Sequence, residues 1–362
     1  MCEAKHTIDC YHHLARHMDE APIGAPLTAE LVEILQSLFT PKQASLASSL
    51  PFKPTRLETL AQDLGPKLGI SAGELGQTLE EMADQGLVYK SGGRYSLLPL
   101  VPGMAETQFM DGQTGKAKKD LAQLFDNYYE PGIGQAMISL PLPYSRVIPL
   151  GKTVENHQEI LPYEKAAEVV KAASYTALTN CYCREQAEML GKGCAHPKDV
   201  CLMFGPFARF SAEKGWAKEI GKEEALKTLD RAAEAGLIHV TDNVAKGANF
   251  LCNCCGCCCM FLKTLTKLKH PGAVAQAGFT AEVDRAQCTA CGACLEACQV
   301  QAIRQEDDEP AMVDPDYCLG CGQWQAACFF DAIKLERRGK IIPPPDDFKK
   351  LAGLIMAGRQ EN

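Results

Sequence analysis

Cysteine is the residue type best able to do chemistry in this chain, and its distribution is uneven. The 362 residues include 19 cysteines. Seven of them form two short runs between residues 288 and 328, and ten more lie between residues 181 and 259. Thiolates at this density are typical ligands of soft metal centres such as zinc and iron–sulfur clusters. We therefore expect metal–thiolate chemistry in two stretches of the chain.

The two C-terminal runs have the spacing of iron–sulfur ligands. The first is C-x2-C-x2-C-x3-C, and the second repeats it with one member missing. Paired zinc sites also use C-x2-C pairs, but they need neither a third cysteine after a further gap of two nor a fourth after a gap of three. The spacing thus favours iron–sulfur clusters over zinc. The first run consists of Cys288, Cys291, Cys294 and Cys298, and the second of Cys318, Cys321 and Cys328.

Through these motifs, residues 279–336 resemble the bacterial-type two-cluster ferredoxins, a family with a ferredoxin-like βαββαβ fold. In that family the last cysteine of each run ligates the other cluster. The resemblance implies one 4Fe-4S cluster on Cys288, Cys291, Cys294 and Cys328. It implies a second cluster on Cys298, Cys318 and Cys321.

The second cluster site lacks one ligand of the family pattern. Trp324 stands where the family has a cysteine, and it cannot ligate iron. A 3Fe-4S cluster, a cubane with an exchangeable fourth ligand and an absent cluster are all compatible with this substitution. Gln299 and Phe329 replace the proline that follows each fourth cysteine in the family. That departure bears on cluster potential more than on cluster existence.

The ten cysteines of the middle region also favour metal ligation. Closely packed thiolates repel one another unless a metal neutralises them, and adjacent cysteines rarely satisfy disulfide geometry. Neighbouring side chains in the run CNCCGCCC point to different sides of the backbone, so one small cluster cannot collect all six of its cysteines. Ten thiolates suffice for two cubanes or for one larger or non-cubane assembly, and we expect two or three of them to be small buried hydrophobic groups instead. The ten are Cys181, Cys183, Cys194, Cys201, Cys252, Cys254, Cys255, Cys257, Cys258 and Cys259.

Two residues beside these cysteines are candidates for a direct part in chemistry. Arg184 follows Cys183 and can donate charge-assisted hydrogen bonds to a cluster sulfide or an anionic substrate; a solvated surface arginine is the alternative. His196, in the segment GCAHP, is a candidate cluster neighbour or proton donor, with an ordinary turn residue as the alternative.

A separate group of cysteines and histidines, the residue types that ligate zinc, lies at the N-terminus and is a candidate metal site. A disordered, metal-free terminus is the favoured alternative for such a histidine-rich segment. The group consists of Cys2, His6, Cys10, His12, His13 and His17.

Apolar residues at helical spacing predict four helices in the N-terminal part, and a hairpin follows them. Thr28 and Ser71 suit helix N-caps, and Pro41 suits a first helical turn. This order is typical of a winged helix. The predicted helices cover residues 28–39, 41–50, 54–64 and 71–85, and the hairpin covers residues 87–98.

The helix in the recognition position of this predicted winged helix is acidic. It carries Glu74, Glu80, Glu81 and Asp84, with no lysine or arginine. A DNA-reading helix needs positive charge to meet phosphate. The sequence therefore favours a scaffold or protein-interaction role for this region.

We predict an α+β protein of several domains. The predicted domains are a winged-helix-like domain over residues 1–100, an irregular α/β cysteine-rich domain over 101–277, a ferredoxin domain over 278–338 and a tail over 339–362. In the middle domain a helix over 162–173 leads into a strand over 174–180, which delivers Cys181 and Cys183 at its end. In the tail, Phe348, Leu351, Leu354 and Ile355 share one face of a short helix and are expected to pack back on the body.

Composition limits the classes of partner and the cellular location that the sequence allows. The chain has 46% hydrophobic and 23% charged residues with a net charge of −8, which argues against a nucleic-acid partner. No apolar stretch is long enough for a membrane span. A cytoplasmic location is the natural inference. No nucleotide or flavin motif appears, so electron exchange with redox protein partners or enzyme subunits is expected, and an oligomer is compatible with the sequence.

The patterns C-x-C-R, GC-x2-P and CNCC-x-CCC make the whole chain resemble multi-cluster iron–sulfur proteins of anaerobic bacteria and archaea. The first hypothesis is that low-potential electrons pass through the ferredoxin clusters to or from an additional iron–sulfur centre on the 181–259 cysteines. In a second form of this hypothesis, that centre is of an unusual type and is itself catalytic. The chain would then be an iron–sulfur oxidoreductase or an electron-transfer subunit of one. The alternative is a regulator that senses redox state or oxygen and uses its winged helix.

Overall fold

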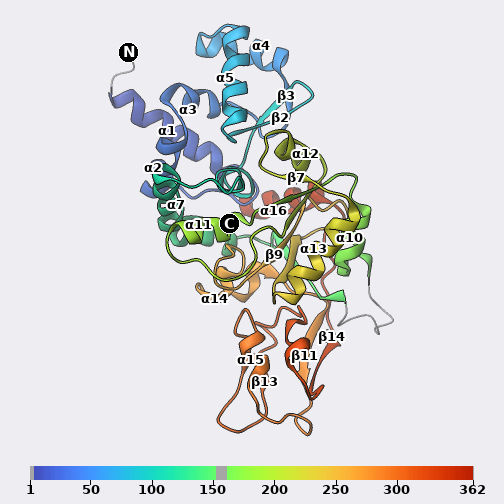
Figure 1. The fold of residues 1–362 in the computed structure, drawn as a ribbon. Helices are drawn as coiled ribbons and strands as arrows, with labels where there is room; N and C mark the ends of the chain where they lie inside the picture. The colour runs from blue at the N-terminus through green and yellow to red at the C-terminus, as the bar shows by residue number, and fades with distance from the viewer. Residues whose placement is uncertain (1–3, 152–160, 362) are drawn as a thin grey trace.

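The structure is a computed structural model that describes residues 4–151 and 161–361. Three regions follow one another along the long axis of the molecule (Figure 1). A helical N-terminal region lies at one end, a mixed region with a large sheet lies in the centre, and the C-terminal cysteine module lies at the other end. The cysteines of interest therefore belong to the central region and to the C-terminal module.

The N-terminal region combines helices with a small antiparallel sheet of order β1-β3-β2. Thr28 caps α2 by accepting a hydrogen bond from Leu31 N, and Ser71 caps α5 by accepting one from Glu74 N. The helix predicted over residues 54–64 begins only at Leu57, because Thr55 and Arg56 form β1 and pair with the hairpin strand β3. The elements are α1 (Ala4–Asp19), α2 (Ala29–Leu38), α3 (Pro41–Ala47), β1 (Thr55–Arg56), α4 (Leu57–Leu68), α5 (Ala72–Asp84), β2 (Val88–Ser91) and β3 (Arg94–Leu97).

Short helices connect this region to the central sheet. They include α7, whose residues Leu121, Ala122, Phe125 and Tyr128 are buried. The elements are η1 (Leu100–Met104), α6 (Ala105–Thr107), α7 (Lys116–Tyr128), η2 (Tyr129–Gly134) and α8 (Gln135–Ile138).

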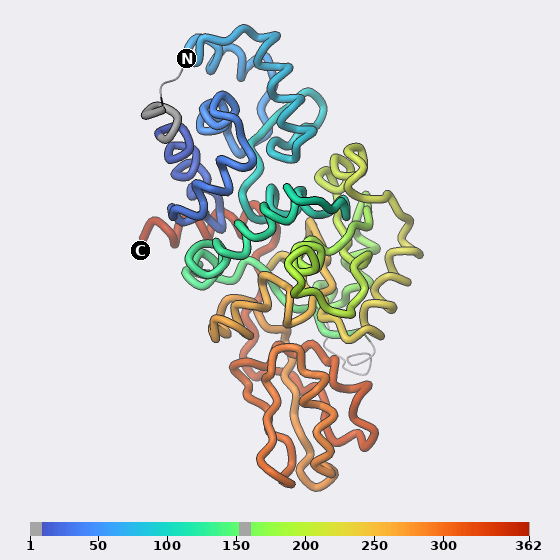
Figure 2. The backbone as a smooth tube through the Cα atoms, turned by 60° about the vertical axis from the view of Figure 1, so that its left-hand side comes forward, coloured from blue at the N-terminus to red at the C-terminus, as the bar shows by residue number. Residues whose placement is uncertain are grey.

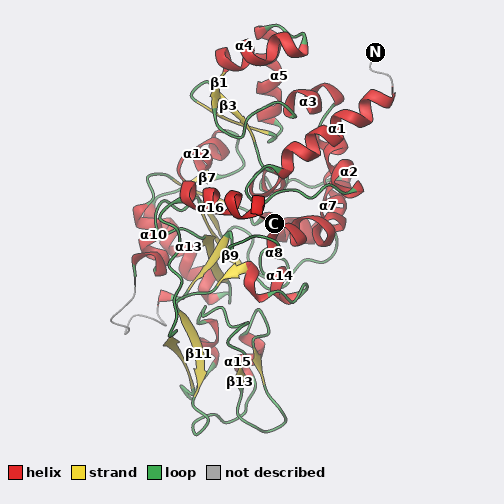
Figure 3. Ribbon diagram, turned by 180° about the vertical axis from the view of Figure 1, so that it is seen from behind, coloured by secondary structure: helices red, strands yellow, loops and turns green. Residues whose placement is uncertain are grey.

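The central region is built on a seven-stranded sheet of order β10-β4-β8-β9-β6-β5-β7 (Figure 3). Its pairs are antiparallel except β10 with β4. The region was predicted to be irregular, and the regular sheet was missed because strands of two to five residues are too short to give a clear periodic pattern. The strands are β4 (Ser145–Ile148), β5 (Thr176–Thr179), β6 (Cys201–Phe204), β7 (Lys218–Glu219), β8 (Ile238–Asp242), β9 (Phe250–Cys254) and β10 (Val274–Ala275).

Helices cover the sheet. Leu251 of β9 packs in a core with Val170 of α10 and Leu229 of α13. Side chains alternate along a strand, so Cys252 and Cys254 of β9 project to the face opposite Leu251. The helices are η3 (Pro162–Glu164), α10 (Ala166–Ala172), α11 (Tyr182–Met189), α12 (Gly205–Glu213), α13 (Lys222–Glu234), α14 (Lys263–Thr266) and η4 (Pro271–Ala273).

The C-terminal module consists of two strand pairs and two short helices. The register pairs Phe279 with Arg337 at the end near the body and Val283 with Ile333 at the free end. The elements are β11 (Phe279–Val283), α15 (Ala293–Ala297), β12 (Ile303–Arg304), β13 (Met312–Val313), η5 (Gln323–Ala327) and β14 (Ile333–Arg337).

The last helix, α16 (Phe348–Glu361), returns to the N-terminal region (Figure 2). Leu351 and Ile355 are fully buried, and Arg359 Nη2 pairs with Asp19 Oδ1 of α1 at 3.0 Å. Leu354 is 47% exposed, so the predicted apolar face is narrower than expected. Among the helices of the described ranges, none is both long and apolar enough to cross a membrane.

Candidate metal centres

Four cysteines gather near the free end of the C-terminal module. Burial raises the pKa of Cys294, and the nearby thiols of Cys288, Cys328 and Cys291 add to the effect. The same four cysteines line a small hollow together with Phe330 and Ile333. A hollow surrounded by four thiols fits a 4Fe-4S cluster, which takes four cysteine ligands. We call these four cysteines the distal set.

Three cysteines gather at the end of the module that faces the body. Cys321 lies near Cys318 and Cys298, and burial raises its pKa to about 12. Backbone N–H groups donate to the sulfurs: Ala302 N lies 3.2 Å from Cys298 Sγ, and Ala281 N lies 3.4 Å from Cys318 Sγ. Cys298, Cys318 and Cys321 form the proximal set. Three thiols with such donors fit a cluster that is one cysteine short of a cubane.

Trp324 of η5 stands at the position of the missing ligand. Its side chain is only 3% exposed. The indole therefore takes up interior space beside the proximal set without supplying a ligand atom for iron.

The proximal end of the module is held against the central region by a close backbone contact. Gly256 N, in the middle of CNCCGCCC, donates to Gln299 Oε1 at 3.1 Å. A Cβ at Gly256 would lie 1.8 Å from the carbonyl oxygen of Gln299, so only glycine permits this approach. Gln299 follows Cys298 directly, so the contact links the proximal set to the cysteines of the central region.

Further hydrogen bonds fix the same interface. Leu150 N donates to Cys321 O at 3.0 Å, and Tyr317 Oη donates to Lys269 O at 2.9 Å. Gln323 Nε2 donates to Leu237 O. The proximal set is thus the part of the C-terminal module that lies nearest to the central sheet.

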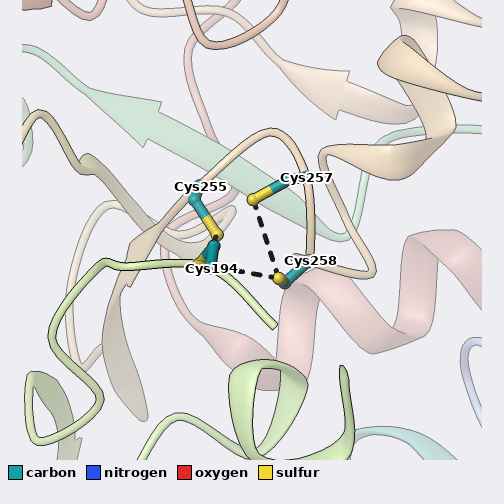
Figure 4. A group of neighbouring side chains, drawn as sticks. All are labelled: Cys194, Cys255, Cys257 and Cys258. Atoms are coloured by element: carbon teal, nitrogen blue, oxygen red, sulfur yellow. Dashed lines mark hydrogen bonds between the residues drawn. The ribbon is translucent and has the colours of Figure 1, made fainter. Parts of the chain in front are cut away.

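Four of the ten central cysteines form a compact group (Figure 4). Cys255, Cys257 and Cys258 come from one arched loop, and Cys194 approaches from a separate segment. The Sγ atoms of Cys194 and Cys255 are 3.9 Å apart, those of Cys194 and Cys258 are 3.7 Å apart, and those of Cys257 and Cys258 are 3.6 Å apart. We call these residues the four-thiol group.

These distances identify the kind of metal the four-thiol group suits. Four sulfurs bonded to one tetrahedral ion at about 2.3 Å are about 3.8 Å apart. All four thiols lie within 4.8 Å of one another, and within the described ranges this is the one set of three or more ligand groups that does so. A single tetrahedral ion therefore fits the group as it stands.

The other six central cysteines come together at one end of the sheet. Cys181 follows β5, Cys183 lies in the first turn of α11, and Cys201 begins β6. The register that pairs Leu202 with Leu251 brings Cys201 beside Cys252 of β9. The six are Cys181, Cys183, Cys201, Cys252, Cys254 and Cys259.

The six thiols form a closed ring in which each hydrogen-bonds with two others. The order around the ring is Cys181, Cys183, Cys259, Cys254, Cys252, Cys201 and back to Cys181. Hydrogen bonds from Cys201 and Cys254 lower the pKa of Cys252 to about 6. We call these residues the six-thiol ring. All ten central cysteines thus have thiol neighbours. The expectation that two or three of them serve as small buried hydrophobic groups stays a prediction.

Arg184 lies between the four-thiol group and the six-thiol ring. It is 1% exposed, so the alternative of a surface arginine was wrong. Nη1 and Nη2 donate to Asn253 O, with Nη1 at 3.1 Å, while Nε is buried without a partner in the described ranges. Burial works against its charge, but the thiols of Cys181, Cys201, Cys255 and Cys254 outweigh it and raise the pKa of Arg184. The guanidinium therefore faces sulfur from both sets.

Two residues beside the ring were missed in the sequence. Burial raises the pKa of Glu106 to about 7, and the carboxylate lies near Cys252 and hydrogen-bonds with Tyr182. Tyr182 also hydrogen-bonds with Cys183. The position of Tyr182 between two cysteines was a usable signal, whereas nothing in the sequence near Glu106 pointed to the ring.

His196 and the N-terminal residues take other places. His196 is partly buried two residues after Cys194, and its side chain makes no hydrogen bond to a thiol in the described part of the chain. The ring nitrogens of His17 form hydrogen bonds with the Glu20 carboxylate and with Leu50 O, and not with another described residue of the N-terminal group. Cys10 and His13 line a pocket of about 740 Å³. Cys2 and the side chain of His6 lie outside the described residues.

Residues 287–332 match the family described as 4Fe-4S dicluster domain. The match includes all seven cysteines of the distal and proximal sets and ends before β14. No curated protein and no solved structure matches the chain. The chain therefore contains a 4Fe-4S dicluster domain near its C-terminus, beside a second cysteine-rich region.

Proposed function

We propose that this chain is an iron–sulfur electron-transfer protein in which electrons enter through the dicluster domain and reach metal–thiolate centres on the ten central cysteines. Iron–sulfur clusters supply one-electron carriers whose potentials depend on hydrogen bonds, charge and exposure. In this proposal Cys288, Cys291, Cys294 and Cys328 hold a 4Fe-4S cluster. Cys298, Cys318 and Cys321 hold a cluster that lacks a fourth cysteine, and a 3Fe-4S cluster is the form we favour.

The observation that carries the proposal is the contact of Gln299 with Gly256. Cys298 is covalently next to Gln299, and Gly256 is covalently next to Cys255 and Cys257. One hydrogen bond of 3.1 Å joins these two segments. A continuous path thus runs from the Cys298 thiol along the main chain and the Gln299 side chain, through a single hydrogen bond, to Gly256 and the four-thiol group.

Exposure and charge favour inward electron flow. Cys291 of the distal set is exposed, and Phe329 beside Cys328 is 89% exposed, which leaves the free end accessible to a redox protein. At the proximal set, two backbone N–H groups donate to sulfur, and the Arg338 guanidinium lies near Cys318. Positive charge and N–H donors stabilise the reduced form of a cluster. The body-facing cluster is then the better electron acceptor.

The N-terminal region fits the role of a scaffold rather than of a DNA reader. Asp84 of α5 pairs with Lys214, and the ring of Tyr89 packs on Phe210 of α12 at 5.3 Å. Glu80 accepts a hydrogen bond from Lys90 Nζ at 2.7 Å. The contacts of Asp84 and Tyr89 join an acidic winged-helix-like domain, residues 1–100, to the cysteine-rich domain, residues 101–277, while the Glu80–Lys90 bond lies within the first of these domains. They support electron transfer over the alternative of a redox-sensing regulator.

The test is reduction of the central centres through the dicluster domain. The double variant Cys318→Ser/Cys321→Ser removes two of the three proximal thiols and leaves the distal four. With a reduced ferredoxin as donor under anaerobic conditions, we expect the wild type to reduce its central centres in rapid-mixing spectroscopy. The variant should do so at least tenfold more slowly while its distal EPR signal persists. Equal rates in the two proteins would refute the relay.

A further inference from the structure

We propose that the six-thiol ring is a metal centre of its own, separate from the four-thiol group, and that it binds a polynuclear iron–sulfur cluster. The proposal deepens the proposed function, since it names the internal end of the electron path. The three steps that support it concern ligand number, charge and separation.

Ligand number favours more than one metal ion in the ring. A tetrahedral metal ion takes four thiolates, and the four-thiol group is already complete for one such ion. The ring offers six thiols in a closed chain of hydrogen-bonding neighbours, from Cys181 through Cys259 and Cys252 to Cys201. Six terminal or bridging thiolates require more than one metal ion. Iron with sulfide is favoured because the same chain contains a 4Fe-4S dicluster domain.

Metal ions would offset the charge that the ring cysteines carry as thiolates, the form that ligates metal. Five of its cysteines are buried, namely Cys181, Cys183, Cys201, Cys254 and Cys259. The charged groups near them are Arg184, whose guanidinium faces Cys181, Cys201 and Cys254, and the acidic Glu106 beside Cys252. One guanidinium does not offset several buried thiolates. The buried Nε of Arg184, which has no partner in the described ranges, is a donor available to a sulfur ligand.

The two sets share no cysteine, although their members are mixed in sequence. Along residues 252–259 the ring takes Cys252, Cys254 and Cys259, while the four-thiol group takes Cys255, Cys257 and Cys258. Strand alternation places the first two on one face of β9, and the turn at Gly256 carries the next three to the other side. Arg184 is the side chain that faces both sets.

Matched cysteine variants of the full chain test the proposal. Cys252→Ser removes a partly buried ring thiol, and Cys257→Ser removes a thiol of the four-thiol group from the same run. Iron, zinc and acid-labile sulfide are counted per chain in each anaerobically purified protein, and the dicluster EPR signals serve as an internal reference for folding.

We expect Cys257→Ser to lose one iron ion with no loss of sulfide. Cys252→Ser should lose two or more irons together with sulfide and keep the ion of the four-thiol group. Equal losses in the two variants would show that the ten cysteines serve shared clusters, and loss of zinc without sulfide in Cys252→Ser would show a zinc–thiolate site. Either result overturns the proposal. If Cys252→Ser lacks the dicluster EPR signals and is therefore misfolded, the same metal and sulfide counts are made on Cys254→Ala, which removes another thiol of the ring.

These counts do not depend on the relay. A chain that carries both central centres but fails to reduce them through the dicluster domain would refute the proposed function alone. A chain that transfers electrons but has no extra polynuclear cluster would refute the inference alone.

Discussion

The distal set and the four-thiol group each present four cysteines, but they space their sulfurs differently. The distal thiols surround a hollow, whereas three pairs in the four-thiol group lie 3.6–3.9 Å apart. A cubane needs room between its ligands, and a single tetrahedral ion does not. The comparison teaches that sulfur separation, rather than the number of cysteines, distinguishes a cluster site from a single-ion site.

The supporting elements explain the difference. In the dicluster domain, gaps of two residues keep the first cysteines of each run close together, and the last cysteine of the other run, Cys298 or Cys328, follows directly after a short helix. In the central region, cysteines from a strand end, a helix start and a tight loop meet at one end of a sheet. Direct neighbours such as Cys254 and Cys255 then separate into different sets.

The largest effect is expected from Arg184→Gln, which removes the cation shared by the two central thiol sets. Loss of a buried charge that faces thiolates should cost about 3 kcal/mol of stability. Unfolding of the reconstituted protein in denaturant, followed anaerobically, measures this. The dicluster EPR signals should stay unchanged, which confines the effect to the central side of the comparison.

Arg184→Lys is the matched control for that change. It keeps the charge but loses the two-pronged donation to Asn253 O, so about half of the lost stability should return. If the Gln and Lys variants are equally stable, the charge of Arg184 contributes nothing to the thiol sets.

A smaller effect is expected from Gly256→Ala, which acts at the contact between the two regions. The new Cβ would meet Gln299 O at 1.8 Å, so the two segments must move apart. Overpacking of this kind costs about 1–3 kcal/mol, and electron transfer from the dicluster domain should slow in stopped-flow measurements. Gly73→Ala, where nothing lies within 4 Å of the new Cβ, is the control: it should leave the transfer rate unchanged, and it should not destabilise the chain, because alanine favours a helix over glycine. An unaltered transfer rate in Gly256→Ala would place the electron path elsewhere.

The smallest effect is expected from Trp324→Cys, which makes the proximal set resemble the distal one. A fourth thiol on η5 should raise the iron content by one per chain and replace the EPR signal of a three-iron cluster with that of a cubane. Trp324→Phe keeps an aromatic group without a ligand atom and should leave the iron count at its original value. An iron count that stays the same in Trp324→Cys would mean that the position does not reach the cluster.

Much of the dicluster domain was accessible from the sequence. The seven cysteines and their gaps indicated 4Fe-4S chemistry, and the match over residues 287–332 supports it. Helices α2 to α5 of the N-terminal region were also located from their caps and apolar spacing, as Thr28 and Ser71 illustrate, whereas α1 was not predicted. The seven-stranded sheet was missed, because its strands are short and their partners lie far apart in sequence.

What the sequence determined by itself is local. Ligand type, the C-x2-C gaps and the missing cysteine at Trp324 follow from residues within one run, where a few backbone bonds limit how far sulfurs can lie from one another. Tertiary structure decided the division of the ten central cysteines into four and six, the burial of Arg184 between them and the contact of Gln299 with Gly256. These features join segments that lie 43 to 69 residues apart, and only strand register and packing bring such segments together.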